Sequence, residues 1–255
     1  MDNEYAIRRF SEFLQIRSVS SEGPVTGAYA ECVAWLKDWA VSIGLSCRVH
    51  ELVANKPILV ATWIGSEPSL PSVLLNSHYD VVPVMEEHWT QPAWEGKRAD
   101  GRVYGRGAQD MKCVCVQYLL AIGRLKSSGF LPRRTVHLSY VPDEEIGGVE
   151  GMGAFITSGE LEALQIGVAL DEGLANPKNA YTVFYGERSP WWIMITAKGP
   201  TGHGATLQRT LRLCTAPAHA HTGHRDGARY PMRPGIPQPH RTHMIHVVVQ
   251  AVASL

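Results

Sequence analysis

The 255-residue chain lacks the sequence features of a membrane protein or a secreted protein. No run of apolar residues approaches the roughly 20 that a membrane-spanning helix needs, and residues 1–10 carry too many charges for a secretory signal. The five cysteines are odd in number and scattered, which argues against a disulfide framework. They are Cys32, Cys47, Cys113, Cys115 and Cys214. We therefore expect a cytoplasmic protein with no membrane partner.

The chain also has no net charge, since 24 Lys and Arg residues balance 24 Asp and Glu residues. The balance is uneven along the chain, because residues 208–255 hold six arginines against a single acid, Asp226. A basic segment can bind nucleic acid, but this one has no interleaved aromatic residues and no recognisable binding motif. We expect no nucleic-acid partner.

Three other kinds of site lack their sequence signature. There is no Gly-x-Ser-x-Gly elbow, so a serine hydrolase has no visible nucleophile. Gly105-Arg-Gly107 resembles the start of a dinucleotide fingerprint, but Asp110 stands where the third glycine belongs and would repel a pyrophosphate. Cys113 and Cys115 occupy an apolar helical run, where their thiols point about 200° apart. They are expected to be buried structural cysteines rather than metal ligands.

Hydrophobic periodicity predicts an alternation of helices and strands. Apolar stripes predict helices over 6–14 and 29–43, the second closed by Gly44, and further helices over 111–126 and 152–157. Strand-like runs cover 47–52, 58–63, 72–76, 135–141 and 167–170. The order favours an α/β fold with a mostly parallel mixed sheet flanked by helices.

Potential metal ligands follow these strands where each strand ends. His78 and Asp80 follow the run 72–76, Glu144 and Glu145 follow 135–141, and Glu172 follows 167–170. Asp110 opens the helix over 111–126 after a glycine-rich turn. The loops beyond the carboxyl ends of parallel strands converge on one crevice, so these side chains can meet.

One imidazole and several carboxylates suit a divalent transition metal, with zinc the best match. Each residue also has an ordinary explanation, since Asp110 can cap a helix and a Glu-Glu pair is usually a solvated turn. Three strand ends in succession carry the same ligand types, however. The set as a whole therefore predicts a two-metal hydrolase site.

Five sequence blocks resemble the M20 metallopeptidase family, in particular its members that remove acyl groups from amino acids. These blocks are Leu74–Val84, Arg106–Lys112, Val141–Gly148, Leu170–Pro177 and Thr182–Trp192. The resemblance covers about residues 1–207. It implies a zinc exopeptidase-like catalytic domain over 1–187, followed over 188–207 by the start of a lid and dimerisation domain.

The resemblance also implies a ligand set for two zinc ions. His78 and Glu172 would bind one zinc, Glu145 would bind the second, and Asp110 would bridge both. Asp80 would accept the other ring N–H of His78, which fixes the tautomer of the imidazole and raises its basicity.

The same resemblance implies the chemistry and the substrate, a small N-acyl-L-amino acid. Glu144 would be the general base that takes a proton from water, and His203 would supply positive charge to the tetrahedral oxyanion. The products would be a free amino acid and a carboxylate, typically from an N-acetyl derivative of a neutral aliphatic amino acid.

Residues 208–255 depart from the family pattern. This Pro-, Arg- and His-rich tail has no sustained periodicity and is expected to be disordered. A late histidine ligand of the second zinc and the rest of the family's homodimer surface are not recognisable. Two alternatives thus stand beside the amidohydrolase: a catalytically impaired fragment of one, with little or no activity and a doubtful dimer, and an M20 dipeptidase.

Overall fold

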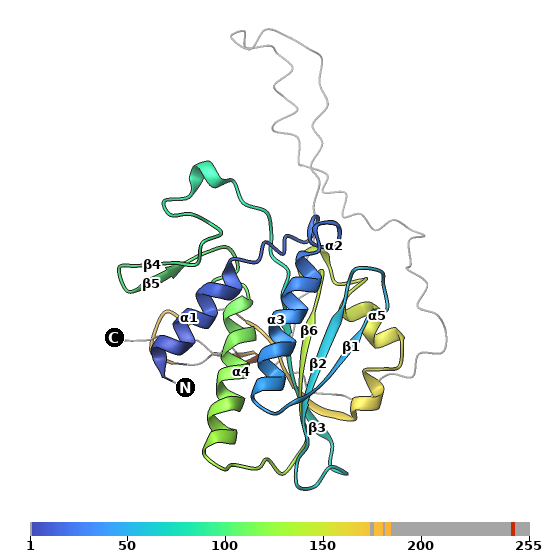
Figure 1. Ribbon diagram of the computed structural model, residues 1–255. Helices are drawn as coiled ribbons and strands as arrows, with labels where there is room; N and C mark the ends of the chain where they lie inside the picture. The colour runs from blue at the N-terminus through green and yellow to red at the C-terminus, as the bar shows by residue number, and fades with distance from the viewer. Residues whose placement is uncertain (1, 174–175, 181, 185–245, 248–255) are drawn as a thin grey trace, which may run out of the picture. The chain divides into compact units, whose positions relative to one another are not determined.

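The computed structural model describes residues 2–173, 176–180, 182–184 and 246–247, and Figure 1 shows the arrangement of their elements. Its helices are α1 (Asn3–Leu14), α2 (Gly23–Thr26), α3 (Ala28–Ser42), α4 (Lys112–Ser127) and α5 (Met152–Thr157). The strands of its main sheet are β1 (Ser46–His50), β2 (Ile58–Trp63), β3 (Ser72–His78), β6 (Val136–Val141) and β7 (Ile166–Leu170). The predicted elements are therefore present in the predicted order.

The main sheet has the strand order β1-β2-β6-β3-β7. Strand β2 is antiparallel to both of its neighbours, β1 and β6, whereas β3 is parallel to both β6 and β7. Four of the five strands consequently run in one direction, with β2 reversed. The mostly parallel mixed sheet predicted from the sequence is confirmed.

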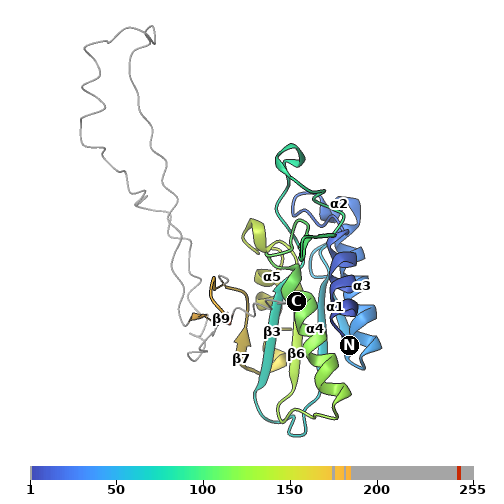
Figure 2. The same ribbon diagram turned by 90° about the vertical axis from the view of Figure 1, so that its left-hand side faces the viewer.

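Helices cover both faces of this sheet, as the edge-on view of Figure 2 shows. Helices α1, α3 and α4 lie on one face, and α5 lies on the other. Strand β2 is buried on both sides: Leu59 and Ala61 pack into the cluster beneath α3 and α4, while Ile58 and Val60 pack with Phe155 of α5. This two-sided burial explains why β2 is a continuous apolar run rather than an alternating one.

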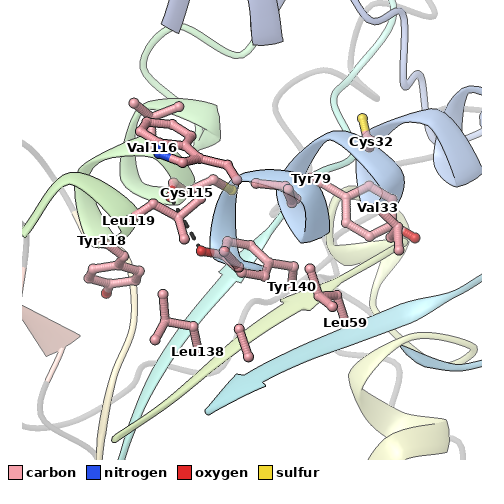
Figure 3. Packing of buried hydrophobic residues seen from close by; sticks show 14 of the residues in the cluster. Cys32, Val33, Leu59, Tyr79, Cys115, Val116, Tyr118, Leu119, Leu138 and Tyr140 are labelled. Atoms are coloured by element: carbon pink, nitrogen blue, oxygen red, sulfur yellow. Dashed lines mark hydrogen bonds between the residues drawn. The ribbon is translucent and has the colours of Figure 1, made fainter. Parts of the chain in front are cut away.

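The larger core lies between β6 and helices α3 and α4 (Figure 3). Leu138 and Tyr140 project from β6 toward Cys115 and Leu119, and the Tyr140 hydroxyl lies 3.5 Å from the carbonyl oxygen of Cys115. Cys115 is fully buried and Cys113 half-buried. Both thiols are free, as are the other cysteines that the structure describes, Cys32 and Cys47.

Sequence periodicity did not predict the hairpin of β4 (Lys97–Ala99) and β5 (Arg102–Tyr104). The two turn residues, Asp100 and Gly101, have φ values of 52° and 70°. Positive φ at both positions defines the hairpin turn that an Asp-Gly pair favours. That dipeptide was a readable signal for the hairpin.

Most of the expected lid segment and tail lies outside the described residues, including all of 188–207. Within the tail, the structure describes only β9 (His246–Val247), which pairs antiparallel with β8 (Val183–Phe184). Among the helices of the described part of the chain, none is long and apolar enough to cross a membrane.

Candidate metal centre

Three neighbouring parallel strands bring their carboxyl ends to one edge of the sheet. His78 is the last residue of β3 and pairs with Val141, the last residue of β6. On the other side of β3, Leu75 pairs with Leu170, the last residue of β7. The segments that follow these strands therefore start beside one another.

The His78 imidazole lies at the centre of a group of carboxylates. Its Nε2 atom is 3.1 Å from Asp110 Oδ1, 3.4 Å from Glu172 Oε1 and 3.7 Å from Glu144 Oε2. One donor atom each from His78, Asp110 and Glu172 lie within 4.8 Å of one another. One nitrogen and two carboxylate oxygens at this spacing form a donor set that suits a divalent transition metal.

Electrostatics show that this group is short of positive charge. Burial disfavours protonation of His78, yet the hydrogen bonds that its ring donates to Asp110, Asp80 and Glu172 hold its pKa well above its ordinary value. Burial, together with the charge of Asp110, raises the pKa of Glu145 to about 7. A bound cation would relieve both effects, because it would neutralise carboxylates that now repel one another.

Asp80 is fully buried and ties the two sides of the site together. Its carboxylate lies 3.3 Å from His78 Nδ1 and accepts hydrogen bonds from the backbone N–H groups of Glu144 (3.1 Å) and Glu145 (3.2 Å). The Ser20 hydroxyl donates a further hydrogen bond of 2.8 Å to Asp80 Oδ2. Sequence reasoning did not identify Ser20, which is 60 residues from Asp80.

A second polar chain supports Glu172. Asp171 accepts a hydrogen bond from the backbone N–H of Glu172 through Oδ1 and one from Asn76 Nδ2 through Oδ2, both of 2.8 Å. The Asn76 side-chain oxygen in turn accepts from the Ser139 hydroxyl at 2.6 Å. Glu172 is thus held by a relay that crosses β3 and β6, and no sequence motif pointed to it.

The two glutamates that follow β6 differ in their surroundings. The Glu144 side chain is 53% exposed and faces the imidazole. Glu145 is half-buried and, among the described residues, stands outside the three-residue group that could hold a metal ion. His203, the predicted oxyanion partner, lies outside the described residues.

Comparison with protein families decides the affiliation of this site. Residues 74–230 match the model of the peptidase family M20/M25/M40. The chain belongs to this family. The family match covers all the predicted metal ligands and extends past residue 207, where the resemblance read from the sequence ends.

The chain is also similar to individual members of the M20 family. It is 51% identical over 201 residues to Aminoacylase-1 of Sus scrofa, a match that covers 78% of this chain and 48% of the relative. It is 45% identical over 206 residues to Aminoacylase-1 of Dictyostelium discoideum, covering 80% and 49%. The chain therefore spans about half the length of the curated relatives it matches.

Solved structures support the fold. An M20 family metallo-carboxypeptidase from Sulfolobus solfataricus, Sso-CP2, matches with a TM-score of 0.60 and 27% identity, over 72% of this chain and 40% of that one. Human carnosine dipeptidase 1 matches with a TM-score of 0.61 over 70% and 40%, at 20% identity. The second likeness concerns the fold alone.

Proposed function

We propose that the site hydrolyses the amide bond of small N-acyl-L-amino acids with zinc as its cofactor. The observation that carries this proposal is the grouping of His78, Asp110 and Glu172 at the carboxyl edge of the sheet in a chain about half identical to Aminoacylase-1. The substrates would be N-acetyl derivatives of neutral aliphatic amino acids. The products would be the free amino acid and acetate.

In this proposal His78 and Glu172 would hold one zinc ion, Glu145 would hold a second, and Asp110 would serve both. The grouping of His78, Asp110 and Glu172 supports the first of these two ions, since His78 offers a nitrogen and the two acids offer carboxylate oxygens. Zinc, when bound, supplies Lewis acidity that polarises the amide carbonyl and acidifies water. Asp80 orients the ring of His78 from the side opposite Asp110 and Glu172, because its carbonyl oxygen lies 3.0 Å and its carboxylate 3.3 Å from Nδ1.

Glu144 is the proposed general base. Its carboxylate faces His78 Nε2 at 3.7 Å and is half exposed, so it borders both the candidate metal ligands and solvent. Burial raises its pKa, as do the charges of Glu172 and Asp80, which brings it closer to the pH at which a base works. Glu144 would take a proton from the attacking water and pass it to the leaving amine nitrogen. His203 would donate to the oxyanion.

A dipeptidase remains the second candidate function, since it would use the same residues on a different substrate. The likeness to the metallo-carboxypeptidase Sso-CP2 at 27% identity supports peptide hydrolysis in general. The amidohydrolase is preferred because identity to Aminoacylase-1 is about twice as high.

The test is hydrolysis by the purified, zinc-loaded full chain, followed as release of methionine from N-acetyl-L-methionine and from methionyl-alanine. We expect faster release from the acetylated substrate. Glu144→Gln should lower the rate by about 10²- to 10⁴-fold while zinc content is unchanged. Glu87→Gln, the same change at an exposed glutamate in the segment after β3, serves as the control. Hydrolysis of the dipeptide alone would favour the second candidate, and no hydrolysis of either substrate would refute the proposal.

A further inference from the structure

Lys56 lies in the segment between β1 and β2 and belongs to none of the motifs that mark the site. Its ammonium nitrogen is within hydrogen-bond distance of two carboxylates, Asp143 Oδ2 and Glu150 Oε2. These two acids stand at the two ends of the turn that carries Glu144 and Glu145. One cation therefore joins both ends of the turn that faces His78.

The first of these acids, Asp143, is the fixed end of the turn. It is 1% exposed, and its φ of 65° is uncommon for a residue with a side chain. Its carbonyl oxygen accepts hydrogen bonds from the N–H groups of Gly148 (2.7 Å) and Ile146 (3.2 Å). The hydroxyl of Tyr29 donates to Asp143 Oδ1 at 2.7 Å, so Lys56 and Tyr29 each occupy one carboxylate oxygen.

The backbone beside Lys56 is itself tied to the metal-centre strand. The carbonyl oxygen of Pro57 accepts a hydrogen bond of 2.6 Å from the hydroxyl of Tyr79, the residue after His78. Tyr79 is fully buried and contacts the Tyr29 ring edge to face, with ring centroids 5.1 Å apart. The backbone that carries Lys56 is therefore held in place relative to His78.

The contact of Lys56 with Asp143 and Glu150 matters because the turn between these two acids is negatively charged. The turn carries two glutamates close to Asp80 and Asp110, so like-charge repulsion pushes it away from the site. The Lys56 side chain is only 14% exposed; burial disfavours its charge, but its two carboxylate partners outweigh that effect and raise its pKa. It stays an ammonium, and its charge-assisted hydrogen bond to Asp143, whose side chain is 2% exposed, is of the strong kind. The Glu150 side chain is 56% exposed, so the second contact is weaker.

We propose that Lys56 is a positioning residue that clasps the turn 143–150 and thereby holds Glu144 and Glu145 toward His78. The inference rests on the function proposed above for these two glutamates. Lys56 touches neither of their side chains and acts through Asp143 and Glu150.

The test compares the full chain with Lys56→Met, Lys56→Arg and Lys126→Met. Lys126 is a matched control, because its ammonium also joins two segments: it donates to the Gly44 carbonyl oxygen at 2.9 Å and lies over the Trp63 ring, away from the turn. Two quantities are measured on each protein. One is amide hydrogen exchange of the turn, followed by mass spectrometry; the other is kcat and KM on N-acetyl-L-methionine with zinc.

In Lys56→Met we expect exchange across 143–150 to accelerate by at least about tenfold, because a charge-assisted hydrogen bond holds the turn closed. Exchange in β2 and β6 should not change. We expect kcat to fall about 10- to 100-fold with KM within about twofold, as for lost supporting partners of a metal site. Lys56→Arg should recover most of both losses, and Lys126→Met should behave as the unmodified chain.

Unchanged hydrogen exchange of the turn in Lys56→Met would refute the proposal that Lys56 holds the turn, whatever the activity. Faster exchange with unchanged kcat would overturn its positioning role. If the unmodified chain hydrolyses no substrate, the proposed function fails. The hydrogen-exchange measurement still decides whether Lys56 holds the turn. The two failures are thus distinguishable.

Discussion

Replacement of Asp80 by Asn should destabilise the metal-free chain as well as weaken its metal site. The Asp80 carboxylate is fully buried and accepts hydrogen bonds from Ser20, Glu144 and Glu145. The backbone donors of Glu144 and Glu145 approach different oxygens of that carboxylate. Either orientation of the asparagine amide therefore turns its NH₂ group toward one backbone N–H.

The magnitude follows from the lost hydrogen bonds. A hydrogen bond to a charged group contributes about 1.5–3 kcal/mol, and the orphaned buried donor adds its own desolvation cost. Removal of one negative charge relieves repulsion from Asp110 and Glu144, but these side chains are 60% and 53% exposed. At such exposure the relief is about 1 kcal/mol. The hydrogen-bond loss dominates, and we expect the free energy of unfolding to fall by about 3 kcal/mol.

The assay is urea unfolding of the zinc-free chain, with Asp38→Asn as the matched change at an exposed aspartate. A loss of about 3 kcal/mol lowers the unfolding midpoint by about 1–3 M urea at m-values of about 1–3 kcal/mol/M. Zinc affinity should also fall about 10- to 100-fold, because Asp80 supports His78. Equal midpoints for Asp80→Asn and Asp38→Asn would refute the assignment of Asp80 as the buried acceptor.

Three further predictions follow from the same contacts. Asn76→Ala removes the hydrogen-bond donor to Asp171 and should weaken zinc binding about 10- to 100-fold, as measured by calorimetric titration. A zinc affinity equal to that of Asp38→Asn would contradict the relay to Glu172. Phe155→Ala empties a fully buried position against β2 and should lower the free energy of unfolding by about 3–5 kcal/mol in urea, with a loss below 1 kcal/mol as the contrary result. Zinc affinity should rise with pH between pH 6 and 8, because metal ligands must lose their protons before they bind. The pKa of Glu145 is raised to about 7, and the pKa of His78 is also raised. A flat profile of affinity against pH in competition titrations would contradict this.

The periodicity of apolar residues was sufficient to predict the elements that carry the site. The predicted helix over 152–157 has the bounds of α5, and that over 111–126 differs from α4 by one residue at each end. Such helices and strands are predictable because the spacing of apolar residues along a short stretch of sequence shows which face of the element is buried. The candidate ligand positions followed from this, because all of them stand at a predicted strand end except Asp110, which opens a predicted helix.

Strand direction could not be predicted in the same way. Strand β2 is apolar on both faces, and a strand that is buried on both sides gives no period that tells parallel from antiparallel pairing. Its direction depends on partners far along the chain, such as Leu59 with Tyr140. The sequence patterns therefore led to a mostly parallel sheet without showing which strand is reversed.

The supporting residues of the site were also beyond sequence reasoning. Ser20, Lys56 and Asn76 belong to residue types that are mostly exposed in proteins, and no sequence pattern identified their partners. Each acts on a partner at least 60 residues away: Ser20 on Asp80, Lys56 on Asp143, and Asn76 on Asp171. Only the folded sheet brings these pairs together.

Zinc binding by the purified full chain tests the central claim most directly. Zinc content per chain and the dissociation constant, obtained by competition with a chelator, would be measured for the unmodified chain, Asp110→Asn and Asp38→Asn. We expect the unmodified chain and Asp38→Asn to hold zinc equally, and Asp110→Asn to bind it at least about 100-fold more weakly, since a direct ligand contributes more than a supporting partner. Equal zinc affinity in Asp110→Asn and Asp38→Asn would contradict the metal centre at His78, Asp110 and Glu172.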